Sequence, residues 1–228
     1  MNLRQLLEGS LPGTALIMGR FQPITVAHYN IINMARRNFQ QVYVVIVDPG
    51  PMRAKKKYTM KGTVRVPALR KMWERPFIAR FRAKLVHAAL EGKLDFKNII
   101  TAPTGHVPSV MKKVYDTVSR EQLKKRLTVF TGTDRADEYR QQLKNDLDVT
   151  AITDVMEVKR DMDDAENVSA SKVREAIAND NRDEFERLTP TGIHSYYNDM
   201  KKIIRALPER PINDQNNSNN GLRGIKII

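Results

Sequence analysis

The chain has 228 residues, of which 41% are hydrophobic and 29% charged, a balance that fits a folded globular protein and excludes wholesale disorder. It contains no cysteine, which excludes disulfides, thiolate metal sites and a cysteine nucleophile and suits the reducing cytoplasm, where we expect the protein. No apolar run approaches the roughly 18 residues that span a bilayer, so we expect no membrane contact. Residues 1–12 lack the apolar core of a secretory signal.

The net charge of +13 is concentrated in one segment. Between Arg53 and Lys84 there are twelve Lys and Arg residues and a single acid, Glu74, whereas the rest of the chain is nearly neutral. A patch of this kind attracts polyanions, and nucleoside triphosphates, RNA and DNA all fit that description.

Strands and helices alternate along most of the chain. A buried strand is expected at 14–18, a helix capped by Thr25 at 26–38, and a β-branched strand at 42–47. Further elements are expected in this order: a helix at 76–90, strands at 98–101 and 127–131 separated by a helix at 107–118, a helix from 132 to 143, a strand at 149–158, and helices at 169–178, 182–188 and 195–207. This alternation predicts an α/β fold, a Rossmann-like doubly wound parallel sheet with C-terminal helices.

Two segments interrupt the alternation. Residues 48–75 lack periodicity, and we expect a long loop there. One domain is expected over 1–205, followed by a polar linker and an apolar tail over 206–228. The tail is either a frayed terminus or a strand that docks elsewhere, for example on a neighbouring subunit.

The first motif, GRFQPITVAH at 19–28, lies between the first strand and the first helix. Gly19 lets a ligand approach the backbone, and the free N–H groups at a helix start bind anions. Thr25 and His28 are three residues apart, so a hydroxyl and an imidazole share one helix face and can stabilise charge on a transferring phosphoryl group. The alternative is that Thr25 is only a helix cap and His28 only a core histidine.

The second motif, VSASKVR at 168–174, opens a later helix. Ser169 and Ser171 supply hydroxyls, and Arg174, one turn further on, can clamp a terminal phosphate. The alternative is a helix cap with a surface cation. Both motifs are strand-to-helix transitions, which meet at the carboxyl ends of a parallel sheet, so we expect His28 and Arg174 to converge on one bound polyphosphate.

Together the two motifs resemble the signatures of the nucleotidylyltransferase superfamily, (H/T)-x-G-H near the N-terminus and I-S-S-T-x-V-R near the C-terminus. The form GRFQP is most similar to nicotinamide-mononucleotide adenylyltransferases of the archaeal and bifunctional bacterial type. The segment WERPFIAR at 73–80 is similar to the family's acceptor segment N-P-F-T-x-x-E-R, and Gly132-Thr133-Asp134 is similar to its Gly-x-Asp. A packed tryptophan and a plain turn are the respective alternatives. The resemblance extends over about 14–200.

The resemblance implies a reaction and roles for individual residues. An acceptor phosphate attacks the α-phosphorus of a nucleoside triphosphate, and pyrophosphate leaves. The implied catalytic residues are His28 and Thr25 at the α-phosphate, Lys55 between the reacting phosphates, and Arg174 with Ser169 and Ser171 at the β- and γ-phosphates. Further nucleotide contacts are expected from Gly19, Arg20, Phe21, Gly132 and Asp134, and acceptor contacts from Trp73, Phe77 and Arg80. Mg²⁺ would be carried by the triphosphate and not by protein ligands, and His87, His106 and His194 are expected to be structural.

The leading interpretation is therefore an adenylyltransferase that joins ATP to nicotinamide mononucleotide, giving NAD, and that acts as a homo-oligomer because members of the family usually assemble. A cytidylyltransferase acting on a phosphorylated alcohol is the alternative within the enzyme class. Outside it, a non-catalytic protein could keep the fold and bind nucleic acid or another polyanion through Arg53–Lys84, since two nucleotides need fewer than twelve cations.

Overall fold

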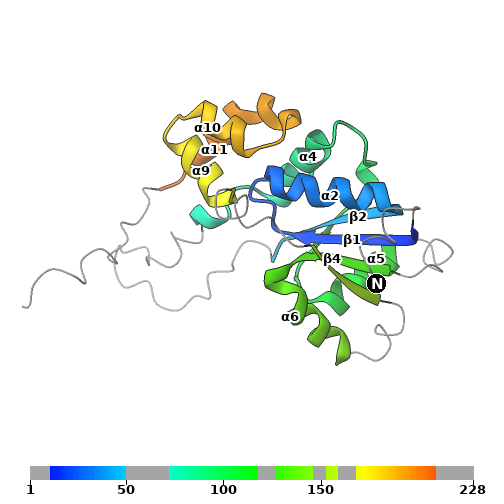
Figure 1. Ribbon diagram of the computed structural model, residues 1–228. Helices are drawn as coiled ribbons and strands as arrows, with labels where there is room; N and C mark the ends of the chain where they lie inside the picture. The colour runs from blue at the N-terminus through cyan, green and yellow to red at the C-terminus, as the bar shows by residue number, and fades with distance from the viewer. Residues whose placement is uncertain (1–10, 50–71, 118–126, 146–152, 159–167, 209–228) are drawn as a thin grey trace, which may run out of the picture.

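The computed structural model describes residues 11–49, 72–117, 127–145, 153–158 and 168–208 (Figure 1). Within these ranges five parallel strands form one sheet in the order β3-β2-β1-β4-β5. The strands are β1 (Leu11–Gly19), β2 (Phe39–Val47), β3 (Ile99–Ala102), β4 (Leu127–Gly132) and β5 (Thr153–Val158). The strand order changes direction between β1 and β4, which creates a switch point at their carboxyl ends. The predicted α/β class with a Rossmann-like parallel sheet is confirmed.

Helices connect the strands and continue beyond them. They are α2 (Val26–Asn38), α4 (Ala79–Ala89), α5 (Val107–Thr117), α6 (Thr133–Lys144), α9 (Ala170–Ala178), α10 (Arg182–Leu188) and α11 (Tyr197–Arg205), with 3₁₀ turns η1 (Phe96–Asn98) and η2 (Thr191–Tyr196). The bounds of α2 and α10 agree with the sequence prediction. The helix expected at 195–207 begins as the 3₁₀ turn η2 and becomes α-helical only at Tyr197.

The sheet is covered on both faces, as side-chain alternation along a strand requires. Ala15 and Ile17 of β1 pack into one core with α2, α4 and the C-terminal helices, whereas Leu16 packs into a second core with α5 and α6. Figure 1 shows this layering, with α2 and α4 on one side of the strands and α5 and α6 on the other. The helices of the two motifs, α2 and α9, therefore belong to the same face.

The helix α4 begins three residues later than the sequence predicts, because its entry is held in an extended conformation. The side chain of Gln22 donates to the carbonyl oxygen of Phe77 at 2.9 Å and accepts from its N–H at 3.1 Å. Those two bonds fix residue 77 outside the helix, so α4 starts at Ala79. The described part of the expected loop at 48–75 contains a helical turn at 72–74, and in that part the loop prediction is wrong.

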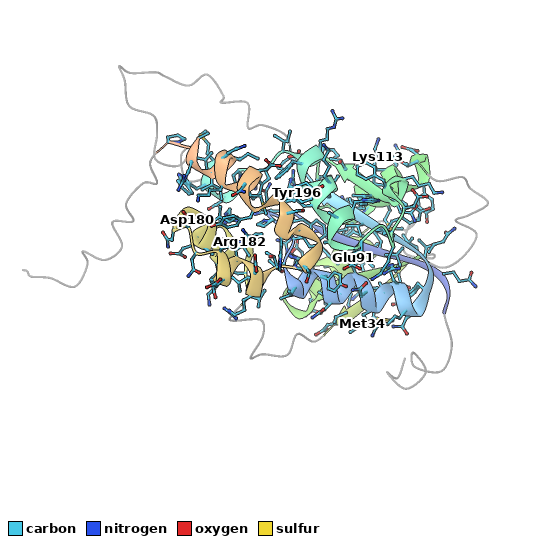
Figure 2. All side chains as sticks on the ribbon, turned by 90° about the horizontal axis from the view of Figure 1, so that it is seen from above. Met34, Glu91, Lys113, Asp180, Arg182 and Tyr196 are labelled. Carbon is cyan, nitrogen blue, oxygen red and sulfur yellow. The ribbon has the colours of Figure 1, made fainter. Side chains whose placement is uncertain are left out.

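The C-terminal helices form a group that is joined to α4 through η2. A Cβ added to Gly192 would lie 2.1 Å from the carbonyl oxygen of Ala88, so only glycine permits this approach of the two backbones. Within the group, Tyr197 and Lys201 of α11 both donate to the carboxylate of Asp180, which follows α9. Figure 2 shows Asp180 and Arg182 in this group.

Two further predictions concern the chain as a whole. Within the ranges that the structure describes, no helix is both long and apolar enough to cross a bilayer. The linker and tail expected over 206–228 lie beyond the described residues from position 209 onward.

Candidate active site

The start of α2 is built by a reciprocal cap between Thr25 and His28. The Thr25 hydroxyl accepts the His28 backbone N–H at 3.4 Å, and the Thr25 backbone N–H donates to His28 Nδ1 at 3.2 Å. Because Nδ1 accepts this bond, the neutral ring carries its proton on Nε2. His28 also lines a cavity, described below. Thr25 is therefore a helix cap. The same cap fixes the tautomer of His28, whose imidazole lies at the cavity wall.

The loop between β1 and α2 is shaped by the ring of Phe21. This residue has a φ of 48°, in the left-handed region, and its ring lies edge-on to the His28 imidazole with centroids 5.1 Å apart. A Cβ on Gly19 would lie 2.9 Å from the Phe21 Cζ, so the glycine makes room for this ring. Phe21 is 1% exposed and supports His28 from within the core.

The second motif contacts the first through this loop. Arg174 of α9 donates from Nη1 to the carbonyl oxygen of Gln22 at 2.6 Å and from Nη2 to the Ser171 hydroxyl at 3.0 Å. Ser169 caps α9 by accepting from the Lys172 N–H at 3.2 Å. The structure thus brings Arg174 to the loop that carries His28 into position, although among the described residues Arg174 does not itself line the cavity.

A buried arginine that the sequence analysis did not select holds the ends of two strands. Arg82 of α4 is 2% exposed; its Nη1 donates to the carbonyl oxygens of Arg20 at 2.7 Å and Val47 at 3.1 Å, and its Nη2 lies 3.1 Å from Asp48 Oδ2. Burial lowers the pKa of the Arg82 guanidinium, and the Asp48 carboxylate opposes that shift. The signal was present in the spacing, because position 82 lies on the same helical stripe as the buried residues at 85, 86 and 89.

A cavity of about 530 Å³ lies at the carboxyl ends of β1 and β4, at the switch point of the sheet. Six segments line it: the end of β1, α2, the end of β2, the turn before α5, the end of β4, and α6. The polar and charged side chains of the lining are Arg20, His28, Thr104, His106, Thr131, Arg135, Glu138, Tyr139 and Gln142. Parallel α/β sheets bind ligands at this position.

The cationic end of the cavity lies beside the first loop. Partial desolvation and the neighbouring charges of Arg75 and Arg135 lower the pKa of the Arg20 guanidinium. Like charges held together in this way favour an anion between them. Arg20 and Arg135 both line this end of the cavity, and Arg135 is not among the site residues predicted from the sequence.

The three residues expected to bind an acceptor lie elsewhere. Phe77 is buried in the first core, and the Trp73 indole donates to the carbonyl oxygen of Pro208 at 2.9 Å. Arg80 is exposed, one helical position from the buried stripe of α4. Among the described residues, none of the three lines the cavity.

The other sequence-predicted residues are placed as follows. Gly132 ends β4, Asp134 lies in the first turn of α6, and Lys55 falls outside the described residues. His106, expected to be structural, lies in the cavity wall, with Nδ1 3.1 Å from the Ser109 hydroxyl. In the part of the chain that the structure describes, no three His, Asp or Glu side chains are grouped to hold a metal ion.

Comparisons with known proteins bear on the fold. Two structures of a bifunctional NMN adenylyltransferase/ADP ribose pyrophosphatase from Francisella tularensis, the second complexed with AMP and a manganese ion, match 86% of this chain at 14% identity, with TM-scores of 0.55 and 0.52. The chain spans about half of that protein, 52% of its length. A protein described as a nicotinate-nucleotide adenylyltransferase, from Vibrio parahaemolyticus, matches over 86% of this chain and 98% of its own at 14% identity and a TM-score of 0.50.

The chain shares its fold with these adenylyltransferase structures. The model of the citrate lyase ligase C-terminal domain matches residues 122–197, a range that includes β4, α6 and the second motif. No curated protein matches the sequence. The predicted resemblance to nucleotidylyltransferases is confirmed at the level of the fold.

Proposed function

We propose that the protein is a nucleotidyltransferase that transfers the adenylyl group of ATP to nicotinamide mononucleotide, forming NAD and pyrophosphate. The observation that carries this proposal is the meeting of the two motifs. His28 lines the switch-point cavity, and Arg174, although 152 residues from Gln22, is bonded to the loop that leads to His28. The activities for which the structural relatives are named, NMN and nicotinate-nucleotide adenylyltransferase, support the choice of substrates.

In this proposal the reaction is a single in-line displacement at the α-phosphorus. A phosphate oxygen of the acceptor forms the new P–O bond, the bond to the β-phosphate oxygen breaks, and the electron pair leaves with pyrophosphate. No protein nucleophile takes part, so the protein's contribution is positioning and stabilisation of charge. His28, protonated on Nε2 because Thr25 occupies Nδ1, donates to a non-bridging oxygen of the α-phosphate.

The remaining charge is neutralised from both motifs. Arg20, at the cavity wall, contacts the reacting phosphates, and Arg174 with Ser169 and Ser171 holds the leaving β- and γ-phosphates. Lys55, outside the described residues, is proposed as a further phosphate contact. Mg²⁺ travels with the triphosphate and keeps most of its waters. The manganese ion and AMP in the Francisella relative support a divalent cation accompanying the nucleotide.

The test is a reconstituted reaction. The purified chain is incubated with ATP, Mg²⁺ and nicotinamide mononucleotide, and pyrophosphate and NAD are quantified together. Equal amounts of the two products are expected, with little product when CTP replaces ATP. Faster turnover with CTP and a phosphorylated alcohol would favour the cytidylyltransferase alternative. Absence of pyrophosphate release with every pair would refute the proposal and leave the non-catalytic alternative.

The non-catalytic alternative depends on Arg53–Lys84, of which residues 53–71 lie outside the described ranges. Two cations of this segment contact or neighbour the candidate site. Arg75 is a neighbouring charge of Arg20, and Arg82 donates to the Arg20 carbonyl oxygen. The homo-oligomer stays a prediction.

A further inference from the structure

The cavity extends across the carboxyl ends of the strands, and different helices support its two sides. The motif helices α2 and α9 pack on the first core, whereas α5 and α6, which supply the other side of the lining, pack on the second. If the triphosphate is held by the motifs, as proposed above, the acceptor occupies the part of the cavity formed by the later turns of α6 and the turn before α5, beyond Gly132 and Asp134, which the sequence predicts as nucleotide contacts. The side chains on that side therefore indicate which chemical groups of an acceptor can bind there.

Three polar side chains of α6 follow one another along this wall. Arg135, Glu138 and Gln142 are spaced by three and four residues, so they share one face of the helix, and all three line the cavity. Arg135 lies near enough to Arg20 to affect its pKa, so it belongs to the cationic end. Gln142 lies at the other end, where its Oε1 accepts the Val107 N–H at 2.9 Å. The wall changes from positive to negative along the helix.

The position of Glu138 is fixed by Gln142. The amide of Gln142 uses its oxygen for Val107 and its nitrogen to donate to Glu138 Oε1 at 3.0 Å. Glu138 is exposed to solvent where it lines the cavity, and the bond donated by Gln142, whose amide oxygen is held by the backbone of α5, orients its carboxylate there. An ionised carboxylate only accepts hydrogen bonds, so Glu138 suits a ligand group that carries N–H or O–H donors.

We infer that Glu138, positioned by Gln142, determines the acceptor's specificity: it favours an uncharged carboxamide on the distal ring and disfavours a carboxylate at the same place. The inference rests on the proposed function. The acceptor phosphate lies at the Arg20–Arg135 end, next to the reacting phosphates, and the ring extends toward Glu138. Nicotinamide mononucleotide presents two N–H donors to this carboxylate, whereas nicotinic acid mononucleotide presents a like charge and no donor.

The other charged or titratable groups of this lining are Arg20, His28, His106, Arg135 and Tyr139. Arg135 is one turn from Glu138 and is grouped with Arg20 at the phosphate end. His106 lies on the turn before α5, with Nδ1 at the Ser109 hydroxyl. The test below measures whether Glu138 outweighs these groups for a ligand carboxylate.

The test compares two variants of α6 by equilibrium binding and by kinetics. Glu138→Gln removes the charge and keeps the shape, and Asp137→Asn, a neighbouring carboxylate with a 98% exposed side chain outside the lining, is the matched control. Affinity for each mononucleotide is measured by calorimetry, and kcat/KM for each is measured with ATP. The wild type is expected to prefer the amide at least about tenfold, a preference that Glu138→Gln reduces about tenfold, mainly through tighter binding of the acid, and that Asp137→Asn preserves.

The inference would be overturned by a wild-type preference for the acid, by an unchanged preference in Glu138→Gln, or by binding of neither mononucleotide. Turnover of both acceptors with equal efficiency would sink the inference and leave the proposed function standing. Binding with the expected preference but without pyrophosphate release would refute the proposed function and leave the specificity inference standing. Gln142→Leu, which frees Glu138 without removing its charge, is expected to reduce the amide preference while the KM for ATP is unchanged, a split that a merely structural role would not produce.

Discussion

The loop before α2 and the entry of α4 lie against each other, yet they are held by different kinds of contact. Thr25 and His28 cap each other across three residues, so a short stretch of sequence contains the whole arrangement. Arg82 instead reaches carbonyl oxygens 35 and 62 positions away, and Gln22 holds Phe77 over 55 positions. Sequence patterns find the first kind of contact and miss the second.

The difference also separates two tasks. The locally capped loop supplies the group proposed to act on the phosphate, whereas the long-range contacts hold that loop in place. Substitutions in the loop should therefore change catalysis more than stability, and substitutions of the supporting residues should do the opposite.

The largest effect is expected from His28→Ala. If Nε2 stabilises charge on the α-phosphate only as the transition state forms, kcat should fall about 10²–10³-fold with little change in KM. The measurement is steady-state pyrophosphate release. His87→Ala, which removes a histidine that contacts Phe96 on the surface side of α4, is the control and should keep wild-type turnover. Full activity in His28→Ala would show that the imidazole is only part of the cap.

Arg82→Met should lower the free energy of unfolding by about 2–3 kcal/mol, because it removes the buried guanidinium that pairs with Asp48 and donates to the carbonyl oxygens of Arg20 and Val47. Denaturant unfolding at neutral pH measures this. Arg80→Met, two residues away on the exposed side of α4, is the matched control and should change stability by less than about 0.5 kcal/mol. Equal losses in the two variants would contradict the distinction between the two arginines.

Gly19→Ala tests whether the loop and its support are coupled. The added Cβ would lie 2.9 Å from the Phe21 ring, which already occupies the space next to His28, so a loss of about 1–2 kcal/mol is expected. Gly105→Ala meets only Val47 methyl groups at ordinary contact distance and serves as the control. The combination with Phe21→Leu should recover part of the loss, and strictly additive losses would argue against a direct clash.

What could be predicted from the sequence follows the same division. The alternation of elements, the parallel sheet and the bounds of α2 and α10 come from periodicity and capping, which are local. The start of α4 at Ala79 could not be predicted because it depends on Gln22. The contacts of Arg82 could not be predicted because the carbonyl oxygens that it binds lie 35 and 62 positions away in the sequence.

The candidate site was predictable to a similar extent. Its α2 side followed from one motif, but the opposite wall combines the turn before α5 with α6. His106, Arg135 and Glu138 belong to no motif, so the sequence did not indicate them. The distance between these segments in the sequence is the physical reason that the cavity's far side was missed.

The smallest effect is expected at Asp180, whose contacts are long-range like those of Arg82 but lie at the surface. Hydrogen bonds from Lys201 and Tyr197 lower the pKa of this carboxyl below its ordinary value of 3.8. A carboxyl with a depressed pKa in the folded state stabilises the fold above the unfolded-state pKa, and this stabilisation is lost as the pH falls through the folded-state value. Asp180→Asn should therefore lower the Tm slightly at pH 6, and the difference from the wild type should shrink as the pH falls below about 4. Asp116→Asn, at an exposed position of α5, controls for the general loss of negative charge. A constant difference across the range would mean that Asp180 acts through the geometry of its hydrogen bonds with Tyr197 and Lys201 and not through its charge, because asparagine also adopts the left-handed conformation, φ 56°, of this residue.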